Sequence, residues 1–168
     1  MNSLSRPFEE LLITTVDDGA FFIGDLFQRK YAHAAPGIGN HVVCFYRKDY
    51  HHFIPLAYLN FLPHDEVMLV GGGMTDGKTF ACMSGDLGDR IRASGGMLYH
   101  MLRFGFDHFK GQCEAYFGHA GDKRAYEVDM RAGFEPTKYQ YLIGHYHKPV
   151  TAERKSYLID MVNDLGPF

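Results

Sequence analysis

Residues 113–134 read CEAYFGHAGDKRAYEVDMRAGF, and this stretch decides the fold. Its first five residues, Cys113–Phe117, are mostly apolar and predict a strand, which a glycine-containing turn follows. Asp122 is suited to cap a helix by accepting hydrogen bonds from free backbone N–H groups. The helix predicted from there stops at Gly133-Phe134, a left-handed ending with a hydrophobic contact beyond it.

Upstream of this stretch, the apolar pattern predicts a strand and a helix followed by an antiparallel meander. Pro55 lacks a backbone donor, so we expect it at a strand edge, a strand start or a bulge. Three glycines, 71–73, are expected to close the meander as a loop. The predicted elements are a strand at 10–16, a helix around 21–27, and strands at 41–46, 53–61 and 67–70.

Residues 74–92 hold scattered glycines and charges, and the apolar 79–83 predict either a short strand or a buried helical turn. A helix is expected from Gly95 to before Lys110, a last strand at 139–147, and a C-terminal helix at about 152–165. The predicted fold class is mixed α/β, with a mostly antiparallel twisted sheet flanked by helices. At 168 residues, we expect one domain that spans residues 1–168.

Composition excludes several classes of protein. A hydrophobic share of 46% and an aromatic share of 15% exclude a disordered chain. The net charge of -3 supplies no general field to attract nucleic acid or an anionic membrane, and no stretch is apolar enough to span one. Three scattered cysteines favour a reducing compartment. We therefore expect a cytoplasmic protein that binds neither nucleic acid nor membrane.

The strand, turn, helix and Gly-Phe stop resemble the C-terminal half of a GNAT-type acyltransferase, with Ala125 eight residues before Gly133 as in that family. The resemblance implies the acyl-CoA N-acyltransferase fold, in which two central strands splay apart to admit the pantetheine arm of coenzyme A. It implies acetyl-CoA as cosubstrate and a primary amine of a small molecule or peptide as acceptor. Two histidine pairs lack a third ligand at characteristic spacing, so we expect no metal.

Such an enzyme must hold a pyrophosphate, for which backbone N–H groups at a helix N-terminus are suited. Residues 92–97 resemble the family's phosphate loop through Arg92 and Gly95, whereas Met97 departs from the small residue at its end. A plain helix entry and solvated arginines are the alternative interpretation. The predicted cofactor-binding residues are Arg90, Arg92, Ala93, Ser94, Gly95, Gly96, Met97, Asp122 and Arg124.

Many family members carry a Tyr four residues after the helix Ala, where it protonates the departing thiolate; this chain has Asp129. An ordinary carboxylate is ionised at pH 7 and would repel a thiolate, unless burial raised its pKa. Tyr126 is a second candidate, although core packing would also explain it. Asp76 is the candidate that accepts the amine's proton, with Thr75, Glu66 and Glu114 as further possibilities that ordinary surface polarity would equally explain.

The function implied by the resemblance is N-acyl transfer from acetyl-CoA to an amine. Two alternatives stay open. One is a catalytically silent protein that binds acyl-CoA as a sensor, which Asp129 and Met97 favour. The other is a protein that keeps this fold without ligand and forms a homodimer through its C-terminal helix.

Overall fold

The apolar and β-branched runs of the N-terminal half form four antiparallel strands in the computed structural model, which describes residues 6–168. They are β1 (Leu11–Val16), β2 (Asn40–Arg47), β3 (Phe53–His64) and β4 (Val67–Thr75), each paired with the next. The predicted meander is therefore confirmed. Pro55 lies at a register shift near the start of β3, where its missing N–H is tolerated.

Three further strands complete the sheet. β5 (Ala115–His119) runs parallel to β4, whereas β7 (Leu142–His145) is antiparallel to β5 and pairs with the short β6 (Glu135–Pro136). The strand order is β1-β2-β3-β4-β5-β7-β6. The predicted fold class, a mixed and mostly antiparallel sheet with helices, is confirmed.

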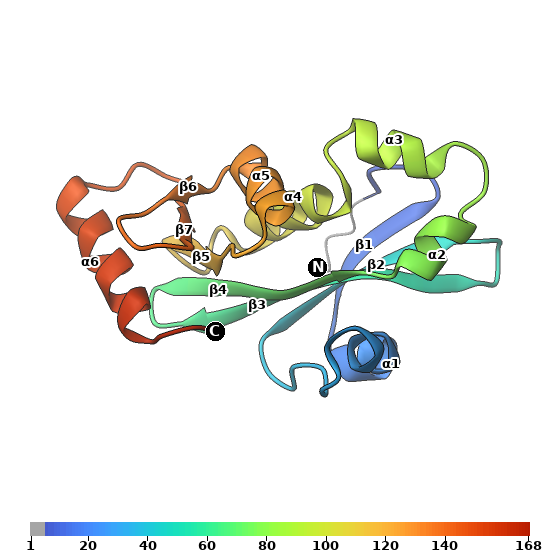
Figure 1. The fold of residues 1–168 in the computed structure, drawn as a ribbon, viewed down its shortest axis with the longest axis horizontal. Helices are drawn as coiled ribbons and strands as arrows, with labels where there is room; N and C mark the ends of the chain where they lie inside the picture. The colour runs from blue at the N-terminus through green and yellow to red at the C-terminus, as the bar shows by residue number, and fades with distance from the viewer. Residues whose placement is uncertain (1–5) are drawn as a thin grey trace.

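The helices are α1 (Gly19–Tyr31), α2 (Gly77–Cys82), α3 (Leu87–Ala93), α4 (Met97–Phe109), α5 (Lys123–Ala132) and α6 (Ala152–Asp164). They cover both faces of the sheet (Figure 1). In that view α1 lies below the sheet, and α2, α3, α4 and α5 lie above it. No helix among residues 6–168 is long and apolar enough to cross a bilayer.

Alternation along the central strands divides the core between the two faces. Met68 and Tyr116 belong to the main core under α3 and α4. Their neighbours Val67 and Phe117 point the other way, into a smaller core that Leu158 of α6 completes. A third cluster packs α1 against β2 and β3. The central strands are therefore apolar on both faces.

The two ends of α5 are formed by the residues that the sequence indicated. The Asp122 carboxylate accepts a hydrogen bond from the Ala125 N–H at 2.9 Å and so caps the first turn. Gly133 has a φ of 120° and donates its N–H to the carbonyls of Asp129 and Met130. These contacts fix the helix and therefore the direction in which its side chains project.

The glycines 71–73 do not form the predicted loop; they continue β4. Asn60 pairs with Gly71 and Tyr58 with Met74, so two glycines of β4 oppose one residue of β3 in a β-bulge. Gly72 has a φ of 64°, which glycine adopts without strain. The three consecutive glycines therefore correspond to a bulge within β4 and not to a loop.

Other parts of the fold also differ from the predictions. The uncertain segment 79–83 lies largely in the helix α2, which has no buried residue, and α3 was not expected. β5 starts at Ala115, two residues late. The final strand is shorter than 139–147, because Tyr141 has a φ of 67° and interrupts the extended backbone just before β7.

Candidate functional site

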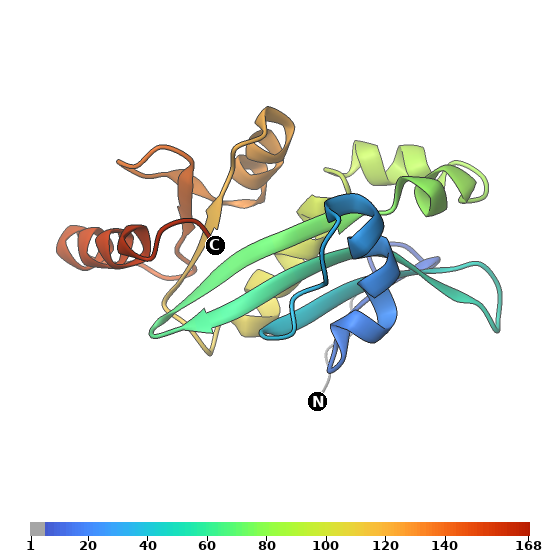
Figure 2. The same cartoon turned by 60° about the horizontal axis from the view of Figure 1, so that its bottom comes forward.

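A cleft opens where β4 and β5 stop pairing. The two strands share only four residue pairs, from Val67 with Ala115 to Val70 with Gly118. The bulge at Gly72 follows at once, and a bulge bends and twists its strand. Figure 2 shows the two strands diverging beyond this point. The backbone edge of β4 from Gly71 to Thr75 consequently faces the gap rather than another strand.

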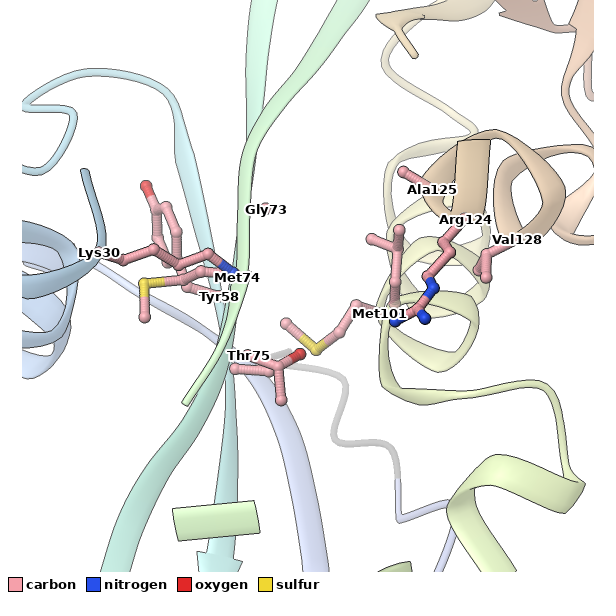
Figure 3. Close-up of a pocket in the computed structure, with 11 residues that line it drawn as sticks. Lys30, Tyr58, Gly73, Met74, Thr75, Met101, Arg124, Ala125 and Val128 are labelled. Atoms are coloured by element: carbon pink, nitrogen blue, oxygen red, sulfur yellow. The ribbon is translucent and has the colours of Figure 1, made fainter. Parts of the chain in front are cut away.

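Two adjoining hollows occupy this gap, with volumes of about 500 Å³ and about 270 Å³. Both are lined by Gly73 of β4, Leu98 of α4 and Ala125 of α5, so they are parts of one cleft. Figure 3 shows the larger hollow between β4 and the two helices, with Met101 and Val128 on its helical side. The size and the mainly apolar walls of the larger hollow are those of a small-molecule site.

Asp129 lines the smaller hollow together with Gly118, whose pairing with Val70 is the last before the two strands part. The residue is 8% exposed. Among residues 6–168, no hydrogen bond or ion pair reaches its carboxylate. Burial disfavours the charged form and raises the pKa of Asp129 from its ordinary 3.8 to about 7. The cleft therefore contains a carboxyl group that is substantially protonated at neutral pH.

Two further polar residues of this hollow were missed by sequence reasoning. His119 ends β5, and partial burial lowers its pKa below the ordinary 6.5, which keeps its imidazole neutral at pH 7. Tyr31 ends α1 and donates its hydroxyl to the Gly73 carbonyl at 2.5 Å. A polar residue at the carboxyl end of a strand beside a gap in an α/β sheet is a signal that could have indicated His119.

Two N–H groups of the predicted phosphate loop already donate hydrogen bonds within the protein. The Gly96 N–H donates to the Ile91 carbonyl at 2.9 Å, and the Gly95 N–H donates to the Arg92 carbonyl, so both close the end of α3. The first three N–H groups of α4, from Met97 to Tyr99, have no partner in the helix and no side-chain cap. Met97 itself is buried in the main core, so its side chain does not crowd that helix end.

Arg90 and Arg92 do not line the cleft. Arg90 donates to Glu10 at 2.8 Å and to Asp86 at 2.9 Å. Arg92 donates to Asp89 at 3.0 Å. Both side chains project from α3 toward intramolecular carboxylates, which is a structural role that the sequence spacing could not reveal.

The other predicted cofactor residues divide in the same way. Arg124 lines the larger hollow beside Met101 (Figure 3). Ala93 is the exposed last residue of α3 and does not line the cleft. The Ser94 hydroxyl donates to the Ile91 carbonyl at 2.9 Å, so it belongs to the helix ending. Asp122 caps α5, as described above.

Two of the three predicted catalytic residues lie away from the Asp129 hollow. Tyr126 is 36% exposed and does not line the cleft, because Ala125 and Asp129, one helical turn apart, occupy the inward face of α5. Asp76 caps α2 by accepting from the Thr79 hydroxyl at 2.6 Å. Burial raises the pKa of Asp76, but hydrogen bonds from Thr79 outweigh it and bring that pKa below the ordinary value. Asp76 is consequently a weak base.

Comparisons with known proteins identify the fold but no sequence relative. No protein-family model matches the chain, and no curated protein matches it.

Three solved acetyltransferases share the fold at low sequence identity. A ribosomal-protein-S5-alanine acetyltransferase from Vibrio fischeri matches with a TM-score of 0.56 and 10% identity, over 88% of this chain and 100% of its own. A ribosomal L7/L12 alpha-N-protein acetyltransferase in complex with coenzyme A matches with a TM-score of 0.51 and 9% identity, over 86% and 96% of the two chains. A putative acetyltransferase from Pyrococcus horikoshii has a TM-score of 0.52 and 11% identity, over 79% and 46%. The protein therefore has the fold of these acetyltransferases, the GNAT acyl-CoA N-acyltransferase fold.

Proposed function

We propose that the protein transfers an acetyl group from acetyl-CoA to a primary amine in the cleft between β4 and β5. The observation that carries this proposal is the buried Asp129 carboxyl group, which lines the cleft and has no hydrogen-bond or ion-pair partner among residues 6–168. A buried, unpartnered carboxyl group is costly to the fold, so its presence in a cleft favours a chemical role.

The cleft offers features that fit the cosubstrate. The larger hollow is apolar and bordered by the unpaired edge of β4, which suits the amide-containing pantetheine arm. The three free N–H groups that begin α4 suit a phosphate, and the exposed Arg124 guanidinium lies on the same helical side of the hollow. Acetyl-CoA supplies an acyl group activated as a thioester.

Asp129 and His119 supply complementary proton transfers. At neutral pH a substantial fraction of Asp129 carries a proton, which it donates to the thiolate sulfur as the carbon–sulfur bond breaks. The neutral His119 accepts the proton that the amine loses as the carbon–nitrogen bond forms. An acid with a raised pKa and a neutral base that line one hollow suit acyl transfer to an amine.

A second candidate is a protein that keeps this fold without turnover. The intramolecular ion pairs of Arg90 and Arg92 and the internal hydrogen bonds of Gly95 and Gly96 favour it, because they remove much of the predicted phosphate site. The two candidates differ in whether thiol is released.

The test compares Asp129→Asn with Asp122→Asn, the same chemical change at the cap of the same helix, where Asn caps equally well. Calorimetry with acetyl-CoA measures binding, and release of free coenzyme A with a panel of amines measures turnover. We expect Asp129→Asn to bind within about twofold of wild type but to turn over roughly 10²-fold more slowly, as loss of a general acid implies. Binding with no turnover by wild type would refute acetyl transfer and support a silent protein that binds acetyl-CoA. No binding would also refute acetyl transfer, and it would support a protein that keeps this fold without the ligand.

A further inference from the structure

A third hollow, of about 610 Å³, lies on the α1 side of β4. It is bordered by the last turn of α1, the end of β4 and the start of α2. Lys30, Met74 and Thr75 line both this hollow and the larger part of the cleft, so the two spaces adjoin at these residues. Figure 3 shows Lys30 and Arg124 approaching β4 from opposite sides.

Three cations line this third hollow, namely Arg29, Lys30 and Lys78, against one carboxylate, Asp76. All three are exposed. Within the part of the chain that the structure describes, none of them forms an ion pair, whereas Arg154 forms close ones. In a chain with a net charge of -3, this hollow is therefore a local concentration of positive charge.

Helix stability explains only part of this arrangement. Arg29 and Lys30 lie in the last turn of α1, where the helix dipole favours cations. Lys78 lies in the first turn of α2, where the dipole disfavours a cation. Its convergence on the same hollow as the α1 pair is not a by-product of helix capping, and it indicates an anion.

We propose that the acceptor amine carries carboxylate groups, which Lys30 and Lys78 bind in this third hollow. The inference rests on the proposed function, since it places the acceptor on the side of β4 opposite Arg124. Arg29 is offset by Asp76, whose pKa it helps to lower, so the two lysines carry the preference. The positive wall also disfavours the ammonium form of the amine and so favours the neutral nucleophile.

The test uses Asp129→Asn loaded with acetyl-CoA, so that acceptor binding is measured while turnover is slowed roughly 10²-fold. One arm titrates 5-aminopentanoate, pentylamine and 1,5-diaminopentane, and the other titrates the amidated tripeptides Ala-Glu-Glu, Ala-Gln-Gln and Ala-Lys-Lys. Removing one exposed charge pair typically changes affinity by about two- to fivefold. We therefore expect the anionic compound to bind at least about tenfold more tightly than the cationic one in one arm, which identifies a small or a peptide acceptor.

A double variant, Lys30→Gln with Lys78→Gln, should reduce that preference to below about threefold. The control is Arg131→Gln on the exposed side of α5, which should leave the preference for the anionic compound unchanged. Equal or tighter binding of the cationic compounds in both arms, or an unchanged preference in the double variant, would overturn the inference. Failure of wild type to bind acetyl-CoA would instead refute the proposed function, and the same series on the unloaded protein would still decide the acceptor charge.

Discussion

The ionisation of Asp129 should make the stability of this protein depend on pH in a way that Asp129→Asn removes. The folded protein holds a proton on this carboxyl group up to a pKa of about 7, whereas the unfolded chain releases it near 3.8. The folded state consequently binds more protons between these values, and its free energy of unfolding falls as the pH rises through that window. Well above the pKa of the folded state, the stability that the protonated carboxyl group contributes is completely lost.

The magnitude follows from the two pKa values. Since each tenfold difference in proton affinity is worth about 1.36 kcal/mol, the full cost of ionising Asp129 in the folded state is about 4 kcal/mol. Over the narrower range from pH 5 to pH 8, which avoids strong acid, the same relation lowers the free energy of unfolding of wild type by roughly 2.5 kcal/mol. Asp129→Asn lacks the titrating group and loses none of this.

Urea unfolding of both proteins at pH 5, 6, 7 and 8 measures the difference directly, because all other titrations are common to the two chains and cancel. From pH 5 to pH 8, the free energy of unfolding of Asp129→Asn should rise relative to that of wild type by roughly 2.5 kcal/mol. A constant offset, within about 0.5 kcal/mol at every pH, would mean that Asp129 ionises like an exposed carboxylate. The assignment of Asp129 as the acid would then lose its basis.

Three further outcomes follow from the packing and charges. Turnover should have a bell-shaped pH profile, falling above about pH 7 as Asp129 loses its proton and falling below the lowered pKa of His119; Asp129→Asn should lack the alkaline limb. Gly105→Ala should lower the free energy of unfolding by about 1–3 kcal/mol or more in urea, because a Cβ there would lie 1.9 Å from the Phe61 ring. The Cys44 thiol, whose pKa burial raises to about 12, should resist disulfide reagents until the protein unfolds.

Each of these outcomes has an internal control. Gly24→Ala, in the middle of α1, meets nothing within 4 Å and should stabilise the protein by about 0.5–1 kcal/mol. Equal effects of the two glycine changes would contradict the packing argument. The exposed Cys82 should react with the thiol reagent at once in the native protein, and simultaneous reaction of both thiols would contradict the burial of Cys44.

Much of the fold could be predicted because its signals are local. The apolar alternation of the strands, the Asp122 cap and the Gly133 stop depend on residues a few positions apart. Glycines 71–73 were assigned to a loop because a bulge and a loop both use a positive φ, and only the pairing partner in β3 distinguishes them. The helix α3 was missed although Leu87 and Ile91, one turn apart and both buried, were a usable signal.

The candidate site was less predictable because its properties depend on distant partners. The helix spacing indicated Asp129, but its raised pKa comes from tertiary burial. The partners Tyr31 and Gly73 are 42 residues apart. Arg90 is joined to Glu10, 80 residues away, so a guanidinium next to the predicted loop was already engaged elsewhere. No pattern within one segment contains these pairings.

The short parallel pairing of β4 with β5 also has a mechanical consequence. Within residues 6–168, four residue pairs form the only ladder between the meander and the strands β5, β7 and β6. A molecule bound in the gap would contact β4 on one side and α5 on the other. It would therefore add contacts between the meander and the C-terminal part of the sheet. Occupancy should therefore raise the melting temperature with the logarithm of ligand concentration, and should slow opening between the two parts of the sheet.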